Sequence, residues 1–185
     1  MGVGRYMHRS VVVGGNFVRM FIGIAVGFPI ILNCIGCLGS QGGEAGDSST
    51  RRQFPLDQLE VSTLTIKEAV FRVWLARDAD SREEGLMWVS EHEIADDQGM
   101  LFVFPDERYL GFWMKNTITP LDIAYARWDG TIVAAHTMPI LTLRTFPSYE
   151  PAMFAFEVKA GTFDRLGIGV GDRLEIPPEV FKVRP

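Results

Sequence analysis

The stretch FWMKNTITPLDIAYA, residues 112–126, holds the side chains of this chain whose types and spacing could support chemistry. A tryptophan, a lysine, an asparagine and an aspartate interrupt otherwise apolar sequence there: Trp113, Lys115, Asn116 and Asp122. An aromatic ring beside a few fixed polar groups is typical of a cleft that binds a small molecule, a glycan or a peptide. The same residues would also fit a hydrolase-type site, in which Asp122 is the general base and Lys115 stabilises developing negative charge.

Asp122 lies between Leu121 and Ile123, in a segment whose pattern predicts a buried strand. Removing a carboxylate from water is costly unless hydrogen-bond donors replace the water. We therefore expect Asp122 to accept bonds from backbone N–H groups or hydroxyls of the turn at residues 116–119. The alternative is a carboxylate held at the mouth of the sheet, as a general base or a ligand-binding group.

Lys115 has three alternative environments at the end of its predicted strand. It could bind an anionic ligand, it could pair with Asp122 or Glu157, or its charged end could reach solvent along an apolar stem. Asn116 and Thr117 are expected to form the turn rather than to react, because asparagine tolerates left-handed backbone geometry.

The remaining candidate side chains are expected to have structural roles. Arg82 and Glu157 are expected to form a buried or half-buried ion pair. The histidines lie far apart in the sequence and form no ligand set: His8, His92 and His136. The methionines of the domain lack the close spacing of a Cu(I) site and are expected to fill the core. We therefore expect neither a metal nor a cofactor.

Short apolar runs predict the elements that position these residues. Alternation over residues 63–77 predicts one or two strands, and further strands are expected at 99–105, 111–115, 152–161 and 169–176. Two apolar runs flank Asp129-Gly130 and predict a hairpin over residues 121–138. Short helices are expected with Asp80 or Ser81 and with Thr162 as their N-terminal caps. This pattern predicts a mainly β (α+β) domain, either a compact curled sheet or a small mixed β-barrel with two or three short helices.

The N-terminal residues have the layout of a secretory signal. Residues 1–19 contain arginines and no acid, and residues 20–37 contain no charge. The run ends in CIGC, which resembles a bacterial lipobox, and its last residue, Cys37, is predicted to be lipidated. We predict a signal segment at 1–37, a flexible linker at 38–59 and a globular domain at 60–185. An uncleaved membrane anchor and ordinary cleavage near the same place are the alternatives.

Charge and cysteine content limit the partners. Residues 1–36 hold three arginines and no acid, so the rest of the chain has 15 Lys and Arg against 23 Asp and Glu, a net charge of −8. This charge argues against nucleic acid as a partner and leaves an acyl group as the expected membrane contact. Cys34 and Cys37 both belong to the signal segment, so the domain has no thiol for a disulfide or a nucleophile. We expect an exported lipoprotein on the periplasmic face of a bacterial envelope.

Six motifs occur in order between residues 61 and 174: SREEGLMW, DQGMLFVFP, FWMKNTITPLDIAYARWDGTIV, MP, FEVKAG and GIGVGDRL. Together they resemble the family of small exported proteins called DUF192 or UPF0127. The resemblance implies a compact β-rich domain with short helices, often behind a signal or lipobox, and it implies no agreed activity. The loop at 139–151 departs from the family pattern, because it lacks a cysteine and additional prolines.

Three hypotheses of function remain open at this point. The first is a non-catalytic envelope module whose cleft near Trp113, Lys115, Asn116 and Asp122 binds a small molecule, a glycan or a peptide. The second is a hydrolase-type enzyme that uses Asp122 and Lys115. The third is a structural or partner-binding envelope protein in which the motif residues serve only the fold. The sequence therefore leaves open whether the protein is an enzyme.

Overall fold

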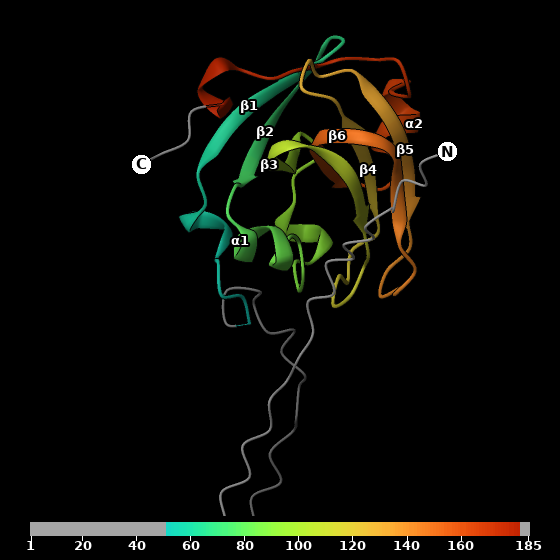
Figure 1. Ribbon diagram of the computed structural model, residues 1–185. Helices are drawn as coiled ribbons and strands as arrows, with labels where there is room; N and C mark the ends of the chain where they lie inside the picture. Colours follow the sequence, from blue (N-terminus) through green and yellow to red (C-terminus); the bar gives the residue numbers. More distant parts are fainter. Residues whose placement is uncertain (1–50, 182–185) are drawn as a thin grey trace, which may run out of the picture. The chain divides into compact units, whose positions relative to one another are not determined.

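The computed structural model describes residues 51–181, which form one curled sheet with short helical segments (Figure 1). The strands are β1 Val61–Ile66, β2 Ala69–Ala76, β3 Gln98–Phe112, β4 Leu121–Ala126, β5 Ile132–Met138, β6 Phe146–Lys159 and β7 Leu174–Glu175. The helices are α1 Ala79–Glu84 and α2 Thr162–Leu166, with 3-10 turns η2 Leu56–Gln58, η3 Glu91–Glu93 and η4 Pro178–Phe181. The predicted mainly β class is confirmed as a half-barrel. The predicted signal segment and residues 38–50 of the predicted linker lie outside the described residues.

The strand order is β5-β4-β6-β3-β2-β1-β7, and every neighbouring pair except β2 and β3 is antiparallel. Parallel strands need a long crossover connection, and here α1 and η3 provide it between β2 and β3. This crossover places α1 at the end of the sheet where β3 leaves toward the loop at residues 113–120 (Figure 1).

The two ends of the sheet meet at the turn between β4 and β5. The N–H of Ile132 donates to the carbonyl of Asp172 at 2.8 Å, and the N–H of Leu174 donates to the carbonyl of Gly130 at 2.9 Å. Gly130 has φ 86°, and a Cβ built there would lie 2.1 Å from the Leu174 carbonyl oxygen. Only glycine fits this contact without a shift of backbone, because both the dihedral and the approach exclude a side chain.

Strand β4 is buried over its whole length, because apolar clusters cover both of its faces. Leu121, Ile123 and Tyr125 pack in the cluster that contains Trp74. Ala124 and Ala126 pack in the second cluster, together with side chains from β1, β2 and β6. Any polar residue on β4 must therefore find its partners inside the protein.

Several predicted elements have different bounds in the structure. The hairpin over residues 121–138 is confirmed. The strand expected at 99–105 and the first two residues of the one expected at 111–115 belong to the single long strand β3, whereas residues 113–115 lie in the loop after it. Its pairing with β6 is interrupted between Val103 and Arg108, and this irregularity accommodates Pro105, which has no N–H to donate. Helix α1 begins after Asp78, whose side chain accepts the N–H of Ser81 at 2.8 Å. Helix α2 begins after Gly161, one residue earlier than expected.

Candidate functional site

Asp122 is buried, and both of its carboxylate oxygens are hydrogen-bonded. Oδ1 accepts the hydroxyl of Thr137 on β5 at 2.7 Å, and Oδ2 accepts the N–H of Phe163 in α2 at 3.0 Å. The expected donors in the turn at residues 116–119 do not supply these bonds. Asp122 therefore joins β4 to β5 and α2, and its oxygens are engaged by protein donors rather than directed at a ligand.

The turn at residues 116–119 is held by the segment that follows α1. The carbonyl of Asn116 accepts the N–H of Trp88 at 2.9 Å, and the Thr119 hydroxyl donates to the carbonyl of Val89 at 2.7 Å. Asn116 has φ 58°, the left-handed geometry that asparagine tolerates best among non-glycine residues. Asn116 and Thr117 thus occupy the predicted turn, and Thr117 donates its N–H to the carbonyl of Met114 at 3.1 Å.

Lys115 lies in solvent beside Trp113. Its Nζ is 5.2 Å from the centre of the Trp113 ring, and 41% of Trp113 is exposed. Among residues 51–181 no hydrogen bond or ion pair joins Lys115 to Asp122 or Glu157. The structure therefore brings Trp113, Lys115 and Asn116 together on one loop and leaves Asp122 in a separate, buried environment.

The ion pair expected between Arg82 and Glu157 does not form. Arg82 donates to the carbonyl of Val103 at 3.0 Å, and its guanidinium lies 4.9 Å from the centre of the Phe104 ring. Glu157 is buried on β6 between Met100 of β3 and Ile123 of β4. Burial among these apolar neighbours raises the pKa of Glu157 to about 8, because removal from water disfavours the charged form.

Residues 51–59, which the sequence assigned to the linker, are packed on the domain. The guanidinium of Arg52 is buried, and it donates to the carbonyls of Met87 and Gly85 at 2.8 Å each. It also forms an ion pair of 3.5 Å with Glu84. No local pattern indicated this contact, because Glu84, Gly85 and Met87 lie more than 30 positions away and two of these partners are backbone carbonyls.

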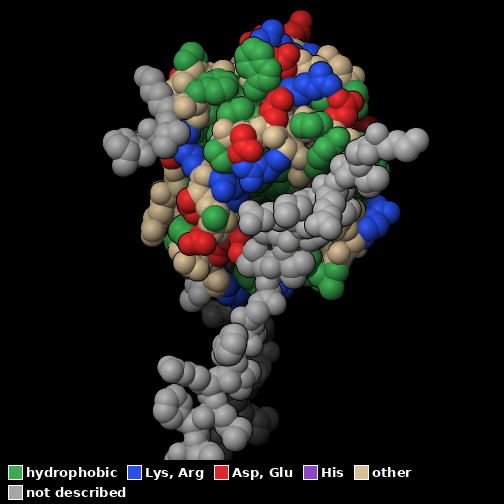
Figure 2. Space-filling model, in the orientation of Figure 1, with side chains coloured by type: hydrophobic (Ala, Val, Ile, Leu, Met, Phe, Trp, Pro, Cys, Tyr) green, Lys and Arg blue, Asp and Glu red, His purple; other side chains and the backbone are tan. Residues whose placement is uncertain are grey.

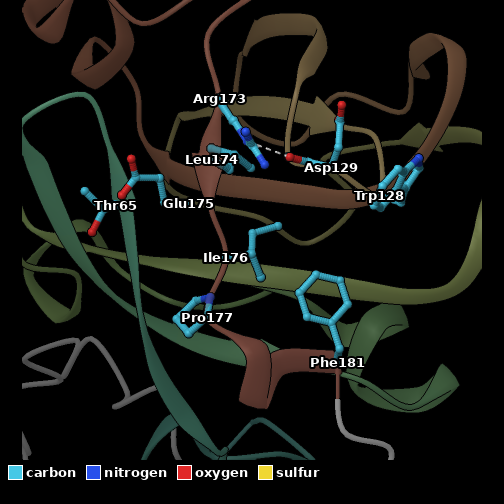
Figure 3. A pocket seen from close by; sticks show the side chains of 10 residues that line it. Thr65, Trp128, Asp129, Arg173, Leu174, Glu175, Ile176, Pro177 and Phe181 are labelled. Carbon is cyan, nitrogen blue, oxygen red and sulfur yellow. Dashed lines mark hydrogen bonds between the residues drawn. The ribbon is translucent and has the colours of Figure 1, made fainter.

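The structure contains a groove that sequence reasoning did not identify (Figure 3). It has a volume of about 740 Å³ and lies where the β4–β5 turn meets β7 and η4. Figure 3 shows Arg173 and Asp129 on one side of the groove, apolar side chains on the other side, and Trp128 at one end. The apolar side consists of Ile176, Pro177 and Phe181. The triplet Trp128-Asp129-Gly130 at a predicted turn was the signal that could have indicated it.

Hydrogen bonds fix the polar side of the groove. Arg173 Nε donates to the carbonyl of Asp129 at 2.8 Å, and Asp129 Oδ1 accepts the N–H of Thr131 at 2.9 Å. Hydrogen bonding from Thr131 lowers the pKa of Asp129, because it favours the charged carboxylate. The backbone N–H of Trp128 donates to Glu107 of β3 at 2.7 Å, which holds the turn while 65% of the Trp128 side chain remains exposed.

The charge around the groove is mixed. Among the described residues that line it, Arg173 is the one cationic side chain, and Asp129 and Glu175 are anionic. On the face in view in Figure 2, Lys and Arg side chains also alternate with Asp and Glu side chains and with hydrophobic ones. A groove of this kind offers donors, acceptors and apolar surface together, without a strong field of one sign.

A family model for DUF192, described as an uncharacterised ACR family, matches residues 62–176. The chain belongs to the DUF192 family. The match covers all the strands of the half-barrel except Val61, the first residue of β1, and it ends just after β7. The resemblance stated from the sequence motifs is therefore confirmed.

Solved structures similar to this DUF192 domain share its fold. One, from Sinorhizobium meliloti 1021 and described as "a putative transcription regulator", is 36% identical with a TM-score of 0.61. The similarity covers 63% of this chain and 94% of that one. Another, a protein of unknown function from Novosphingobium aromaticivorans DSM 12444, is 30% identical with a TM-score of 0.62, over 66% of this chain and 89% of that one. No curated protein matches the chain.

Two further findings concern the described part of this DUF192 protein. Within residues 51–181, no three His, Cys, Asp or Glu side chains gather as a group that could hold a metal ion. None of the helices in the same range has the length and hydropathy of a membrane span.

Proposed function

We propose that this DUF192 protein is a non-catalytic binding module of the bacterial envelope, and that it binds a glycan in the groove between Trp128 and Phe181. The observation that carries the proposal is the pairing of exposed aromatic and apolar side chains with a fixed polar wall. Trp128 and Phe181 are both exposed, and Arg173 and Asp129 are held in place by hydrogen bonds on the facing side.

The chemistry of the groove favours a sugar over other ligands. A pyranose ring has an apolar C–H face, which packs on an aromatic ring, and a hydroxyl edge, which both donates and accepts hydrogen bonds. An indole supplies a large rigid apolar surface, and a guanidinium beside carboxylates supplies donors and acceptors together. A phosphate or another strong anion would instead require a net positive site, and among the described residues of the groove Arg173 is outnumbered by Asp129 and Glu175.

The placement of the motif residues supports a role without catalysis. A general base must reach the proton that it removes. Asp122 is buried and bonded to Thr137 and Phe163, and it has no contact with Lys115. The hydrolase-type alternative built on these two residues therefore has no support from their geometry.

The location in the envelope is proposed from the sequence before the domain. The segment with no charge at residues 20–37 ends in the lipobox-like CIGC, and Cys37 is the proposed site of acylation. The 13 residues that follow, 38–50, lead to Arg51, where the described domain begins. An acylated cysteine at that distance would hold a binding module at the membrane surface.

Calorimetric titration of the full chain in detergent micelles with N-acetylglucosamine oligosaccharides tests the glycan proposal. We expect Trp128→Ala to weaken binding by about tenfold, because the loss of one stacked aromatic ring removes roughly 1 kcal/mol or more. Arg173→Ala should weaken it as well, whereas Tyr109→Ala, a change at an equally exposed aromatic residue outside the groove, should not. The proposal fails if binding is insensitive to Trp128 and Arg173, or if only a peptide ligand responds to their loss.

A further inference from the structure

Exposed apolar side chains gather on two neighbouring loops, far from the groove along β5. They are Trp113, Ile118, Ile140, Leu141 and Leu143, each between 41% and 66% exposed. Backbone bonds hold the loops together: the N–H of Met114 donates to the carbonyl of Thr142 at 2.9 Å, and that of Leu141 donates to the carbonyl of Thr117 at 3.1 Å. We call residues 113–118 and 139–144 the apolar tip. An exposed cluster of large apolar side chains of this kind marks an interaction surface.

The charges on the apolar tip are basic. It contains Lys115 and Arg144 and no Asp or Glu, although the whole chain has a net charge of −5. Lys115 Nζ lies 5.2 Å from the Trp113 ring centre, and the Arg144 guanidinium lies 4.5 Å from the Phe146 ring centre. Aromatic and aliphatic side chains flanked by lysine and arginine are the composition of a surface that rests at a membrane interface.

The chain enters the described domain beside this tip. The guanidinium of Arg51 lies 5.5 Å from the centre of the Trp88 ring, and the Trp88 N–H donates to the carbonyl of Asn116 at 2.9 Å. Figure 1 shows the start of the described chain at the same end of the domain as the loops after β3 and β5. The 13 residues between Cys37 and Arg51 span less than ~50 Å even when fully extended, so an acyl group on Cys37 would keep the tip close to the bilayer.

We propose that the apolar tip docks on the surface of an anionic lipid bilayer. Trp113, Leu141 and Leu143 enter the interfacial region, and Lys115 and Arg144 contact the lipid head groups. The proposal shares the membrane anchor with the proposed function and is independent of the ligand in the groove. It extends the membrane contact expected from the sequence, which was the acyl group alone.

Docking in this way fixes the orientation of the groove. Strand β5 begins at Ile132, which bonds to Asp172 beside the groove, and ends at Met138, directly before the apolar tip. Seven residues of extended chain separate these ends by roughly 20 Å. With the tip on the bilayer, the groove would face away from the lipid, where a soluble or cell-wall glycan can reach it.

Fluorescence quenching in vesicles tests the docking, because all four tryptophans lie within residues 51–181. The full chain is reconstituted in phosphatidylethanolamine and phosphatidylglycerol vesicles that contain phospholipids brominated on their acyl chains. We expect the bromines to quench tryptophan emission in the unaltered chain and in Trp128→Phe. Trp113→Phe should lose most of the quenchable component.

Introducing aspartates into the apolar tip, with a control substitution elsewhere, distinguishes docking of the tip from anchoring by the acyl group. The double variant Ile140→Asp with Leu143→Asp should float with the vesicles through its anchor but lose the quenching of Trp113. The control Val170→Asp alters an equally exposed apolar side chain near the groove end of β5 and should keep both properties. If the unaltered chain floats but its Trp113 is not quenched, docking alone is overturned. If the unaltered chain does not float, the anchor is overturned as well. If the tip becomes buried in the absence of vesicles, and increasingly so at higher protein concentration, its partner is a second copy of the chain. That result would overturn the bilayer proposal.

Discussion

The backbone N–H of Phe163 donates a hydrogen bond of 3.0 Å to Oδ2 of Asp122, across 41 positions of sequence. Because the other carboxylate oxygen accepts the hydroxyl of Thr137, a single side chain on β4 connects a helix and an edge strand to the core of the sheet. This arrangement makes the aspartate of the PLDI motif a structural residue. Its substitution should therefore change stability in a way that depends on hydrogen bonding more than on charge.

Replacement of Asp122 by alanine should lower the free energy of unfolding by about 2–4 kcal/mol, because the buried N–H of Phe163 loses its acceptor. Asp122→Asn should lower the free energy of unfolding by less. Its amide oxygen can accept from the N–H of Phe163 while its NH₂ group donates to the hydroxyl oxygen of Thr137. Urea denaturation followed by circular dichroism measures both variants. Equal losses in the two variants would contradict the hydrogen-bond explanation and would indicate a requirement for the negative charge.

The buried carboxyl group of Glu157 should make the stability of the protein depend on pH. Burial raises its pKa to about 8 in the folded protein, from an ordinary value near 4.5. Between these values the folded state binds a proton that the unfolded state has released, so stability falls as pH rises through this range. The full contribution is present below about pH 4.5 and is lost above about pH 8, at about 1.4 kcal/mol for each unit between the two pKa values.

Comparison with Glu157→Gln isolates this contribution, because glutamine resembles the protonated acid and does not titrate. Urea unfolding of both proteins from pH 5 to pH 9 should show the variant gaining stability relative to the unaltered protein as pH rises. Parallel profiles over that range would mean that Glu157 is ionised in the folded state and that its burial is relieved by water.

Local sequence patterns correctly predicted those features of the fold that depend on residues close together in the sequence. The hairpin at Asp129-Gly130 is present, as the apolar runs on either side of it indicated. The motif at residues 112–126 correctly predicted a turn that Asn116 and Thr117 occupy and a buried acid at Asp122.

Partners that the fold brings from distant segments could not be predicted. The alternation on β4 indicated that Asp122 is buried, but its donors come from β5 and α2 rather than from the adjacent turn. Arg82 and Glu157 have complementary charges in the sequence, yet they lie in separate environments. The groove is assembled from β1, the β4–β5 turn and the C-terminal segment, so the triplet at the turn could indicate an exposed aromatic residue but not the other walls of the site.

Adjacent arginines at the start of the domain should differ sharply in their effect on stability. Arg52 is buried and donates to the carbonyls of Gly85 and Met87, so Arg52→Ala should lower the free energy of unfolding by about 3 kcal/mol. Arg51 is exposed over the Trp88 ring, so Arg51→Ala should change it by less than about 0.5–1 kcal/mol. Thermal or urea unfolding of the two variants compares them directly. Similar small effects would show that residues 51–59 behave as part of the linker.

Gly130 should be required for the groove, and Gly169 provides a matched control in the same region. An alanine Cβ at position 130 would lie 2.1 Å from the carbonyl oxygen of Leu174, and φ there is 86°, so Gly130→Ala must push β7 away from the β4–β5 turn. We expect a loss of more than about 2 kcal/mol in the free energy of unfolding, together with weaker glycan binding, because Arg173 and Asp129 separate. Gly169→Ala meets no atom within 4 Å and should change neither property by a comparable amount. If Gly130→Ala lowers stability but the folded variant binds the glycan with unchanged affinity, binding does not depend on the contact between β7 and the turn. The groove is then not the binding site.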